Sequence, residues 1–363
     1  MALPQLTNKL KRILRPANHT EAGKKLYNQG MQEHTFRALV VEETAPGQFQ
    51  RRVISRGLEE LPEAEVLVRV QFSSLNYKDA LSATGNKGVT RRFPHTPGID
   101  LAGVVEASSS PNFQPGDKVI AAAAGETGVS APGGYGQYVR VPADWLVPLP
   151  RRLTLRQSMV YGTAGFTAAM CVDRLQREGI LPWRGPVLVT GATGGVGSLA
   201  VGILSKEGYA VTAATGKIEH GNMLRALGAS EVLPRAELDD GGRPALLHAR
   251  WAGVVDTVGG SFLAAAIRAT QPGGVITCCG NAASPELSLT VFPFILRGVT
   301  LAGIDATRPS KAERERLWKK LAGRWKLDSL DALAREVPLA ALDEEIERIL
   351  GGRQTGRVVV KLE

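Results

Sequence analysis

The stretch VLVTGATGGVGSLAVGIL, from Val187 to Leu204, constrains the fold more than any other part of the chain. A short apolar run typical of a buried strand leads into glycines and then into a second apolar run typical of a helix. Gly191, Gly194 and Gly197 recur at every third position. Glycines so placed let the backbone turn tightly beside a phosphate at a helix N-terminus. The stretch predicts a dinucleotide-binding βαβ unit, with a plain tight turn as the alternative.

The sequence on either side of residue 158 has two different patterns. Before it, short Val-rich segments separated by turn residues predict strands of an antiparallel barrel or sandwich, at 36–43, 65–72, 100–107, 117–123 and 135–141. After it, strands and helices alternate, which indicates a parallel sheet. The strands are predicted at 187–191, 209–215, 231–234, 253–259 and 273–280, and the helices at 158–175, 197–208, 221–229 and 262–270. Residues 311–323 and 342–352 predict further helices, and 335–339 and 355–363 predict strands.

Composition excludes several classes of protein. The chain of 363 residues is 44% hydrophobic and 22% charged, which is typical of a globular protein of two domains. Its apolar runs are too short for a membrane-spanning helix, and its three cysteines predict neither a disulfide framework nor a cysteine-based zinc site. We therefore expect a cytoplasmic protein. The basic residues 1–35 predict a disordered extension or an upstream start, with a transit peptide or membrane-surface helix as alternatives.

The strand after the glycine motif indicates which dinucleotide is bound. NAD-binding units usually carry an acid about 20 residues after the first glycine. Here the strand ends in Thr215, Gly216 and Lys217, with Glu219 one loop position too late. A hydroxyl and an ammonium would bind a 2′-phosphate that an acid would repel. NADPH is therefore favoured over NADH. Arg235, after the following strand, is a second candidate anchor for the phosphate, or a solvated loop charge.

The loop TGATGGVG also fits short-chain dehydrogenases, but none of the six tyrosines has a lysine four residues later. Instead the chain resembles the medium-chain dehydrogenase/reductase superfamily from about Phe36 to Glu363. The motifs that carry this resemblance are SSLNYKDAL, TPGIDLAGVV, PGDKV, GGYGQYVRV, GTAGFTAA, TGATGGVGS, DTVGG, PFILRGVTLAGID and TGRVVVKL. They are most similar to the zinc-free acrylyl-CoA reductase branch, whose members are also named quinone oxidoreductases.

The resemblance implies a fold and a cofactor. The fold class is α/β plus β, with a GroES-like β-barrel catalytic domain at 36–157 and 311–363. A Rossmann domain, a doubly wound parallel sheet, is expected at 158–310. NADPH and a homodimer are also implied. The expected cofactor-binding residues are Tyr77, Thr163, Thr193, Gly194, Gly195, Val196, Gly197, Thr215, Gly216, Lys217, Arg235, Val258, Gly280 and Arg357.

No metal is expected. The zinc enzymes of the superfamily place a cysteine near the NYKD motif and a histidine in a Gly-His-Glu motif. Here those places hold Asn76 and the sequence Gly98-Ile99-Asp100. The chain therefore lacks the thiolate and the imidazole that would bind zinc there.

The predicted chemistry is hydride transfer to an electron-poor C=C bond. Charge then develops on a carbonyl oxygen, and a proton must reach the α-carbon. The candidate catalytic residues are Asn76 or Tyr77 as the donor to that oxygen, with Asp79 and Asp100 fixing the geometry or storing a proton. Alternatively, Asn76 and Asp100 only cap turns, and Tyr77 packs beside the nicotinamide.

The substrate is expected to be a small molecule: an enoyl-thioester such as acrylyl-CoA, an enone or a quinone. Arg91 and Arg92 in a loop are candidates to receive CoA phosphates, or are solvated charges. The sequence does not separate a CoA-specific enzyme from a quinone or general enone reductase. The net charge of +9 leaves an RNA-binding protein as a third hypothesis, but the aromatic fraction is only 6%, so no nucleic acid partner is expected. No membrane partner is expected either.

Overall fold

The computed structural model describes residues 35–238, 241 and 244–362. These residues form two compact units. The first contains the described residues up to Gly162, together with Arg335–Gln354 and those from Val358 onward. The second contains Thr163–Ala334 and Thr355–Arg357. The predicted N-terminal extension, apart from its last residue, lies outside the described residues.

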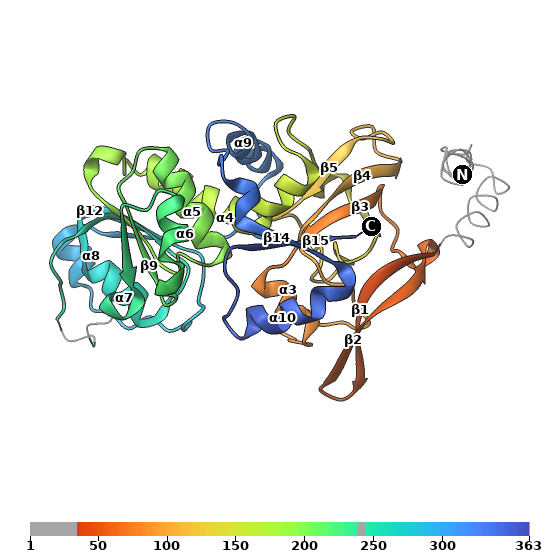
Figure 1. Ribbon diagram of the computed structural model, residues 1–363, viewed down its shortest axis with the longest axis horizontal. Coiled ribbons are helices and arrows are strands. Elements are labelled where there is room, and N and C mark those ends of the chain that lie inside the picture. Colours follow the sequence, from red (N-terminus) through yellow and green to blue (C-terminus); the bar gives the residue numbers. More distant parts are fainter. Residues whose placement is uncertain (1–34, 239–240, 242–243, 363) are drawn as a thin grey trace. The chain divides into compact units, whose positions relative to one another are not determined.

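Along the chain, a part made mostly of strands is followed by a part in which strands and helices alternate, and then by a C-terminal part that contains both (Figure 1). The strands are β1 (Thr35–Ala45), β2 (Gln48–Gly57), β3 (Val66–Ser74), β4 (Leu101–Ser108), β5 (Lys118–Ala121), β6 (Tyr138–Val141), β7 (Val147–Pro148), β8 (Val187–Val189), β9 (Val211–Thr215), β10 (Glu231–Pro234), β11 (Trp251–Asp256), β12 (Thr270–Cys278), β13 (Thr300–Gly303), β14 (Ala334–Pro338) and β15 (Arg357–Lys361). The α-helices are α3 (Tyr77–Ala83), α4 (Leu155–Arg177), α5 (Gly195–Lys206), α6 (Gly221–Ala226), α7 (Gly260–Arg268), α8 (Phe292–Arg297), α9 (Lys311–Ala322) and α10 (Leu342–Leu350).

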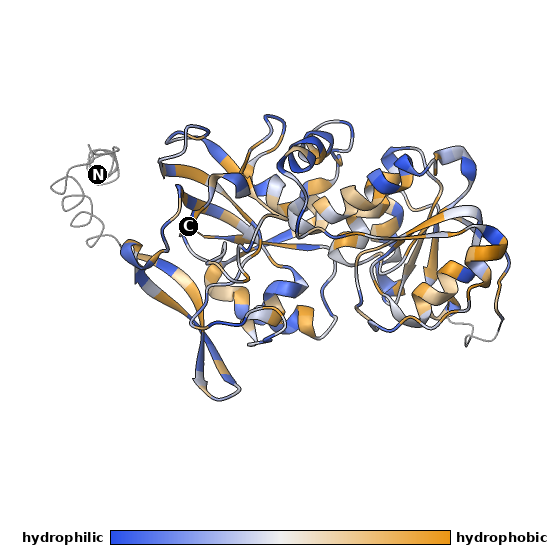
Figure 2. Ribbon diagram, turned by 180° about the vertical axis from the view of Figure 1, so that it is seen from behind, coloured by the Kyte–Doolittle hydropathy of each residue, from blue (hydrophilic) through white to orange (hydrophobic). Residues whose placement is uncertain are grey.

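The second unit is built on a six-stranded sheet in the order β10-β9-β8-β11-β12-β13. Every pairing in it is parallel, as the alternating sequence pattern predicts. The order reverses between β8 and β11, and such a switch point is where doubly wound sheets bind ligands. Strands β9 and β11 are buried throughout, and the strands of this sheet are largely orange in Figure 2, as expected for a sheet covered on both faces.

The first unit is built on antiparallel strands. A seven-stranded sheet runs β14-β15-β3-β4-β5-β7, with β6 pairing to β3 off this path. Strands β1 and β2 form a separate hairpin, which joins the unit through main-chain bonds between Val41 and His95. The core of the first unit is formed by the inward-facing aliphatic residues of β3, β4 and β15. Helices α3 and α10 of the same unit contact each other. Strand β15 pairs with β3, and its residues from Val358 onward group with the first unit.

Helix α9 groups with the second unit, whereas the sequence analysis assigns it to the first. The physical reason is an ion cluster between α4 and α9, formed around the buried carboxyl group of Asp173. Asp173 on α4 accepts hydrogen bonds from Arg316 and Lys320 on α9, each at 2.7 Å. Burial raises the pKa of Asp173, but these two cations outweigh that effect and lower the pKa to about 2. Trp318 on α9 is also buried, and the centroid of its ring lies 6.4 Å from that of Phe166 on α4.

Several local features differ from the prediction. Strands β2, β7 and β13 and helices α3 and α8 are not among the predicted elements. Helix α4 is broken at Gly162, which has φ 50° and ψ −156°, so the predicted single helix is two helical segments. Because φ is positive there, glycine is the residue that fits. The break coincides with the boundary between the two compact units.

No helix in the described part of the chain is long and apolar enough to cross a membrane.

Candidate active site

The glycine loop connects β8 to α5 in the second unit, and its geometry requires glycine at two positions. Gly191 has φ +59°, and a Cβ atom there would lie 2.3 Å from Thr257 Oγ1. Gly197 has an ordinary φ, but a Cβ atom there would lie 2.3 Å from the main-chain oxygen of Gly191. Real Cβ atoms do not approach that closely. The loop and the first turn of α5 are therefore packed backbone against backbone, as a dinucleotide fingerprint requires.

The first turn of α5 is arranged to receive an anion. Gly194 is the N-cap residue, and because it has no side chain it cannot cap the amides that follow it. Arg357 lies beside this turn, with Nη1 3.0 Å from where a Cβ of Gly195 would be. Gly356 N donates to Thr193 O at 3.0 Å and holds that chain segment against the loop. Positive charge beside the N-terminus of a helix is suited to binding an anion there.

The residues that follow β9 are also brought together. Thr193 Oγ1 and Thr215 Oγ1 are 2.9 Å apart, and Thr215 Oγ1 accepts from Lys217 N at 3.0 Å. The Arg235 guanidinium packs on Gly216, where a Cβ would lie 3.3 Å from its Cζ. Two cations, Lys217 and Arg235, thus flank Gly216.

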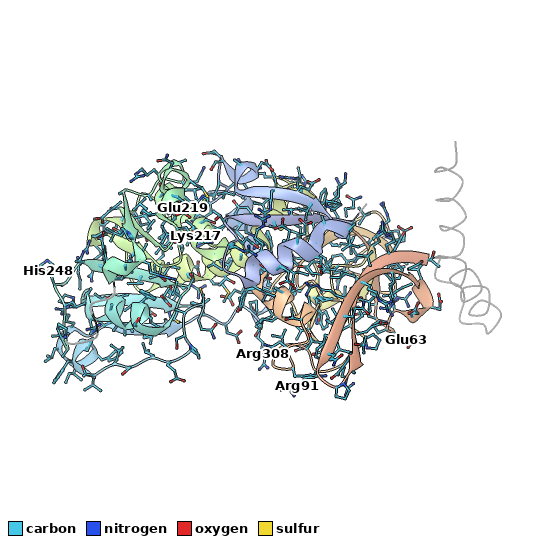
Figure 3. The ribbon with its side chains drawn as sticks, turned by 60° about the horizontal axis from the view of Figure 1, so that its bottom comes forward. Glu63, Arg91, Lys217, Glu219, His248 and Arg308 are labelled. Carbon is cyan, nitrogen blue, oxygen red and sulfur yellow. The ribbon has the colours of Figure 1, made fainter. Side chains whose placement is uncertain are left out.

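Lys217 and Glu219 lie in the segment that follows β9, and Figure 3 labels both. Burial lowers the pKa of Lys217, and the charge of Glu219 partly opposes that effect. The Arg235 guanidinium also lies over the ring of Phe262, with Cζ 5.0 Å from the ring centroid. An ammonium that burial has partly stripped of water gains most from an added phosphate.

Val258 and Gly280 lie where the carboxyl ends of β8, β11 and β12 meet. A Cβ on Gly191 would be 3.0 Å from Val258 Cγ2, and a Cβ on Gly280 would be 2.3 Å from Thr257 O. Thr163 begins the second segment of α4, and Ala164, next to it, is within 3.5 Å of the Cβ position of Gly195. The structure therefore gathers the predicted cofactor residues of the second unit around one loop.

A network that the sequence analysis missed supports this loop. Thr190 Oγ1 donates to Asp256 Oδ1 at 2.7 Å and accepts from Thr257 N at 3.0 Å. Asp256 Oδ2 accepts from Gly259 N at 2.9 Å. Burial raises the pKa of Asp256. These bonds tie β8 to β11, and a threonine or aspartate at a strand end gives no distinctive sequence signal.

Three observations indicate that the residues of the second unit fit the phosphate groups of a dinucleotide. The loop has no room for side chains at Gly191 and Gly197, the amides at the start of α5 have no side-chain cap, and Lys217, Arg235 and Arg357 bring positive charge. Tyr77, the remaining predicted cofactor residue, lies at the first position of α3 in the first unit, with 52% of its surface exposed.

The predicted catalytic carboxyl groups form one buried cluster in the first unit. Asp79 and Asp100 are both fully buried. The Asn76 amide nitrogen Nδ2 lies between them, 3.1 Å from Asp79 Oδ2 and 2.8 Å from Asp100 Oδ2. Asp79 also accepts from the main-chain nitrogens of Asn76 at 2.9 Å and Ile99 at 2.8 Å. Asn76 is the N-cap of α3 and Asp79 its third residue, so the cluster fixes the start of the helix.

The two carboxyl groups are coupled. Burial, and then the charge of Asp100, raise the pKa of Asp79 to about 7. Two buried carboxylates joined through one amide resist simultaneous ionisation. The predicted storage of a proton is therefore consistent with this geometry.

The same geometry distinguishes the two predicted donors. The Nδ2 group of Asn76 carries two hydrogens, and both are directed at carboxyl oxygens. Tyr77 is the next residue on α3 and is half exposed. The contacts therefore favour the Tyr77 hydroxyl over the Asn76 amide as a donor to a substrate oxygen.

The surroundings of the cluster include residues not predicted from the sequence. Ser74 Oγ donates to Asp100 Oδ2 at 2.5 Å, Ser73 Oγ donates to Asp100 O at 2.6 Å, and the Tyr135 hydroxyl donates to Ser74 O at 3.3 Å. Serines at the end of a buried strand give no signal by residue type alone. Within the described ranges, no group of three or more His, Cys, Asp or Glu residues is arranged to hold a metal ion.

Two family descriptions match the chain. The family "Alcohol dehydrogenase GroES-like domain" matches residues 62–151, and the family "Zinc-binding dehydrogenase" matches residues 195–323. "Putative quinone oxidoreductase YhfP" of Bacillus subtilis is 45% identical over 90% of this chain and 99% of its own length. Acrylyl-CoA reductase AcuI of Ruegeria pomeroyi is 44% identical over 90% of this chain and 98% of its own length. The chain belongs to the medium-chain dehydrogenase/reductase superfamily, in the branch of the acrylyl-CoA reductases.

Solved structures of this superfamily agree. The yhdH oxidoreductase of Salmonella enterica, crystallised in complex with NADP, has a TM-score of 0.87 at 40% identity, over 90% of this chain and 100% of that one. The Bacillus subtilis protein yhfP, crystallised with NAD bound, has a TM-score of 0.88 at 44% identity, over 91% of this chain and 100% of that one. The predicted family and the predicted GroES-like and Rossmann folds are confirmed.

The coupling of Asp79 and Asp100 predicts a pH dependence of stability. A carboxyl whose folded pKa is raised to about 7 keeps a proton that the unfolded chain releases near 3.8, so its contribution to stability falls as the pH rises between those values. Asp100→Asn removes the charge that helps to raise this pKa. The free energy of unfolding of the variant, relative to the parent, should therefore increase from pH 4.5 to pH 7.5 in urea titrations.

The control is Asp117→Asn, which changes an exposed carboxyl of the same unit that accepts from Gln114 N. The difference in the free energy of unfolding between Asp117→Asn and the parent should not increase from pH 4.5 to pH 7.5. A pH-independent difference for Asp100→Asn would contradict the coupling.

Proposed function

We propose that this protein is an NADPH-dependent reductase of activated C=C bonds, with an α,β-unsaturated acyl thioester such as acrylyl-CoA as its substrate. The observation that carries the proposal is the glycine loop with Lys217 and Arg235 beside it, in a chain 44% identical to an acrylyl-CoA reductase. Relatives crystallised with NADP support the choice of cofactor. The protein acts in the reducing cytoplasm, where its three free cysteines would stay reduced.

The chain's own residues would hold NADPH as follows. The amides of Gly195, Val196 and Gly197 receive the pyrophosphate, with Arg357 adding charge. Thr215, Gly216, Lys217 and Arg235 receive the 2′-phosphate. Thr163, Val258 and Gly280 line the nicotinamide side. When bound, NADPH supplies the hydride.

The reaction adds one hydride to the β-carbon and one proton to the α-carbon, which gives the saturated thioester. Two electrons enter with the hydride, and the C=C π bond breaks. Negative charge passes to the thioester oxygen until the proton arrives. The Tyr77 hydroxyl donates a hydrogen bond to that oxygen, and Asn76 fixes the start of the helix that carries Tyr77. Asp79, whose pKa is raised to about 7, holds a proton in the first turn of the same helix.

A quinone is the second candidate substrate. It is favoured by one observation, the name of the relative that is 45% identical. Quinone reduction needs the same hydride and the same oxygen donor, but no group that recognises CoA. Arg91 and Arg92 are exposed in the loop after α3, and Figure 3 shows Arg91 at the outer edge of the unit. Guanidinium groups there are suited to the CoA phosphates.

Substrate and cofactor are tested together by NADPH oxidation with acrylyl-CoA and with a small quinone, each repeated with NADH. The expected result is the highest kcat/KM for acrylyl-CoA with NADPH. The double change Arg91→Ala and Arg92→Ala should raise KM for acrylyl-CoA and leave KM for the quinone unchanged. Fast quinone turnover with little thioester activity would assign the enzyme to quinone reduction, and equal effects on both KM values would exclude the CoA role of the arginines.

The role of Tyr77 is tested by Tyr77→Phe. Loss of one donor to a developing oxyanion lowers kcat by roughly 10- to 100-fold, while binding of NADPH stays within a factor of about three. The control is Tyr138→Phe on β6, whose ring packs edge-on against Phe36, and which should retain full kcat. Equal kcat values for Tyr77→Phe and the parent would remove the tyrosine from the mechanism.

We also propose that a second copy of the chain is a partner. Of the eight exposed large apolar side chains in the described ranges, five lie between Leu287 and Leu296. Ile295 and Leu296 on α8 are 67% and 63% exposed, and this helix is orange in Figure 2. Strand β13, next in the chain, is an outer strand of the parallel sheet. An exposed apolar patch and an outer strand are each suited to pairing with a second copy of the chain.

The dimer is tested by light scattering. Ile295→Glu places a charge in the patch and should convert the protein from twice to once the mass of the chain. Trp183→Glu is the control, because Trp183 is 79% exposed and lies outside the patch. A parent protein of monomeric mass, or an unchanged mass for Ile295→Glu, would exclude this interface.

A further inference from the structure

The hairpin of β1 and β2 contacts the loop 84–93, which carries the two exposed arginines of the proposed CoA site. Phe49, near the start of β2, packs against Phe93, with 4.8 Å between the two ring centroids. Its ring also lies against Gly85, where a Cβ atom would be only 2.1 Å from Phe49 Cδ2. Any side chain at Gly85 would therefore displace the ring. One side chain of the hairpin thus contacts the loop near its beginning and at its end.

A charged group in the middle of the loop also contacts the hairpin. The ammonium nitrogen of Lys87 lies 5.0 Å from the ring centroid of Phe49 and 4.9 Å from that of Phe93. At these distances the rings attract a cation. Lys87 Nζ also donates to Glu43 Oε2 on β1 at 2.5 Å, and Glu43 Oε1 accepts from Gly47 N in the turn of the hairpin. The loop is therefore joined to the hairpin by packing and by charge.

The hairpin is itself attached to α10 by the same face of β2. Arg51 follows Phe49 by two residues, and alternate residues of a strand point to the same side. The Arg51 guanidinium pairs with Asp343 and Glu347 on α10. A hairpin attached at this second place gives Phe49 a fixed position from which it can hold the loop.

Arg91 and Arg92 lie between two anchored residues of the loop. Thr90, just before them, is fully buried, and its Oγ1 is 2.7 Å from Ser82 Oγ on α3. Phe93, just after them, is the residue that packs against the hairpin. Both arginines are exposed, and neither forms an ion pair with another residue in the described part of the chain. Their backbone is held on both sides, while their guanidinium groups are available to a ligand.

We propose that Phe49 is a positioning residue that holds Arg91 and Arg92 in place for the phosphates of CoA. The β1–β2 hairpin thereby contributes to the selection of a CoA thioester, although it need not touch the substrate. A loop that is ordered before binding does not have to be ordered by the ligand, so the affinity rises without a new contact. This inference rests on the proposed function, because it takes the two arginines as the groups that bind CoA.

The first experiment compares Phe49→Ala with Val53→Ala. Val53 is on the same face of β2, is also partly buried, and lies opposite Leu39 of β1. Thermal unfolding checks that both variants fold. The measured quantity is the Kd of propionyl-CoA, the saturated thioester, by calorimetry with NADP⁺ present. Phe49→Ala should raise this Kd roughly 3- to 10-fold, and Val53→Ala should leave it within a factor of about two. Phe49→Tyr, which keeps an aromatic ring, should restore the parent value.

A mutant cycle with the arginines separates positioning from a general loss of stability. The double change Arg91→Ala and Arg92→Ala should raise the Kd of propionyl-CoA. Adding Phe49→Ala to that double change should raise it no further, because the side chains that Phe49 positions are already gone. An unchanged Kd in Phe49→Ala, or a further increase in the triple variant, would overturn the proposal.

Trypsin provides a second readout, which needs no ligand. This protease cleaves after lysine and arginine, and the loop offers it Lys87, Arg91 and Arg92. A loop that opens more often is cleaved faster. Cleavage after these three residues, followed by mass spectrometry, should be faster in Phe49→Ala than in the parent and in Val53→Ala. The same rate in all three proteins would show that Phe49 does not hold the loop.

Turnover distinguishes failure of this inference from failure of the proposed function. Acrylyl-CoA is compared with the acrylyl thioester of pantetheine, which lacks the nucleotide and its phosphates. Phe49→Ala should raise KM for acrylyl-CoA only, and kcat should stay the same for both thioesters. If the parent reduces acrylyl-CoA and Phe49→Ala has the parent's KM, this inference alone fails. If the parent reduces neither thioester, the proposed function fails and the CoA role of the hairpin with it, while the trypsin result still decides whether Phe49 holds the loop.

Discussion

The close approach of Gly197 to the main-chain oxygen of Gly191 is the constraint on which the second unit depends. A single methyl group would lie 2.3 Å from that oxygen. Because the contact is between backbones, α5 begins directly at the edge of the sheet, and its first amides are not covered by side chains. The cations Lys217, Arg235 and Arg357 lie around the loop that this contact creates. A similarly tight contact in the first unit, between Gly98 and the main chain at Gly134, precedes Asp100.

Much of the fold could be predicted from the sequence, because apolar periodicity reports directly on burial. The parallel strands β8, β9 and β11 are buried throughout, so runs of mainly apolar residues were enough to assign them. Strand β13, which is only partly buried, was not predicted. Strand β2 was missed because its sequence, QFQRRVISRG, has three arginines and only a partly buried face. Helix α3 was missed because its seven residues are too few to show a helical period. The position of α9 could not be predicted, because an amphipathic pattern shows that a face is buried but not which element covers it.

Some residues of the candidate site could likewise be predicted from the sequence, and others could not. The glycine loop, Lys217 and the NYKD motif have distinctive residue types at distinctive spacings, so they could be found by sequence. Ser74, Thr190 and Asp256 could not, because their roles depend on which oxygen each one faces in the folded chain. The sequence left open whether Asn76 or Tyr77 donates a hydrogen bond to the substrate oxygen. The structure favours Tyr77, because both hydrogens of the Asn76 amide are directed at Asp79 and Asp100.

Gly194 at the start of α5 has a consequence for the dynamics of the protein. A helix whose N-cap lacks a side chain frays more easily at its first turn. An anion bound there would replace the missing cap. The amide hydrogens of Gly195, Val196 and Gly197 should therefore exchange with solvent rapidly in the free protein and slowly once the loop is filled. The rate of hydrogen exchange at these three residues would report occupancy of the site directly, without any turnover of substrate.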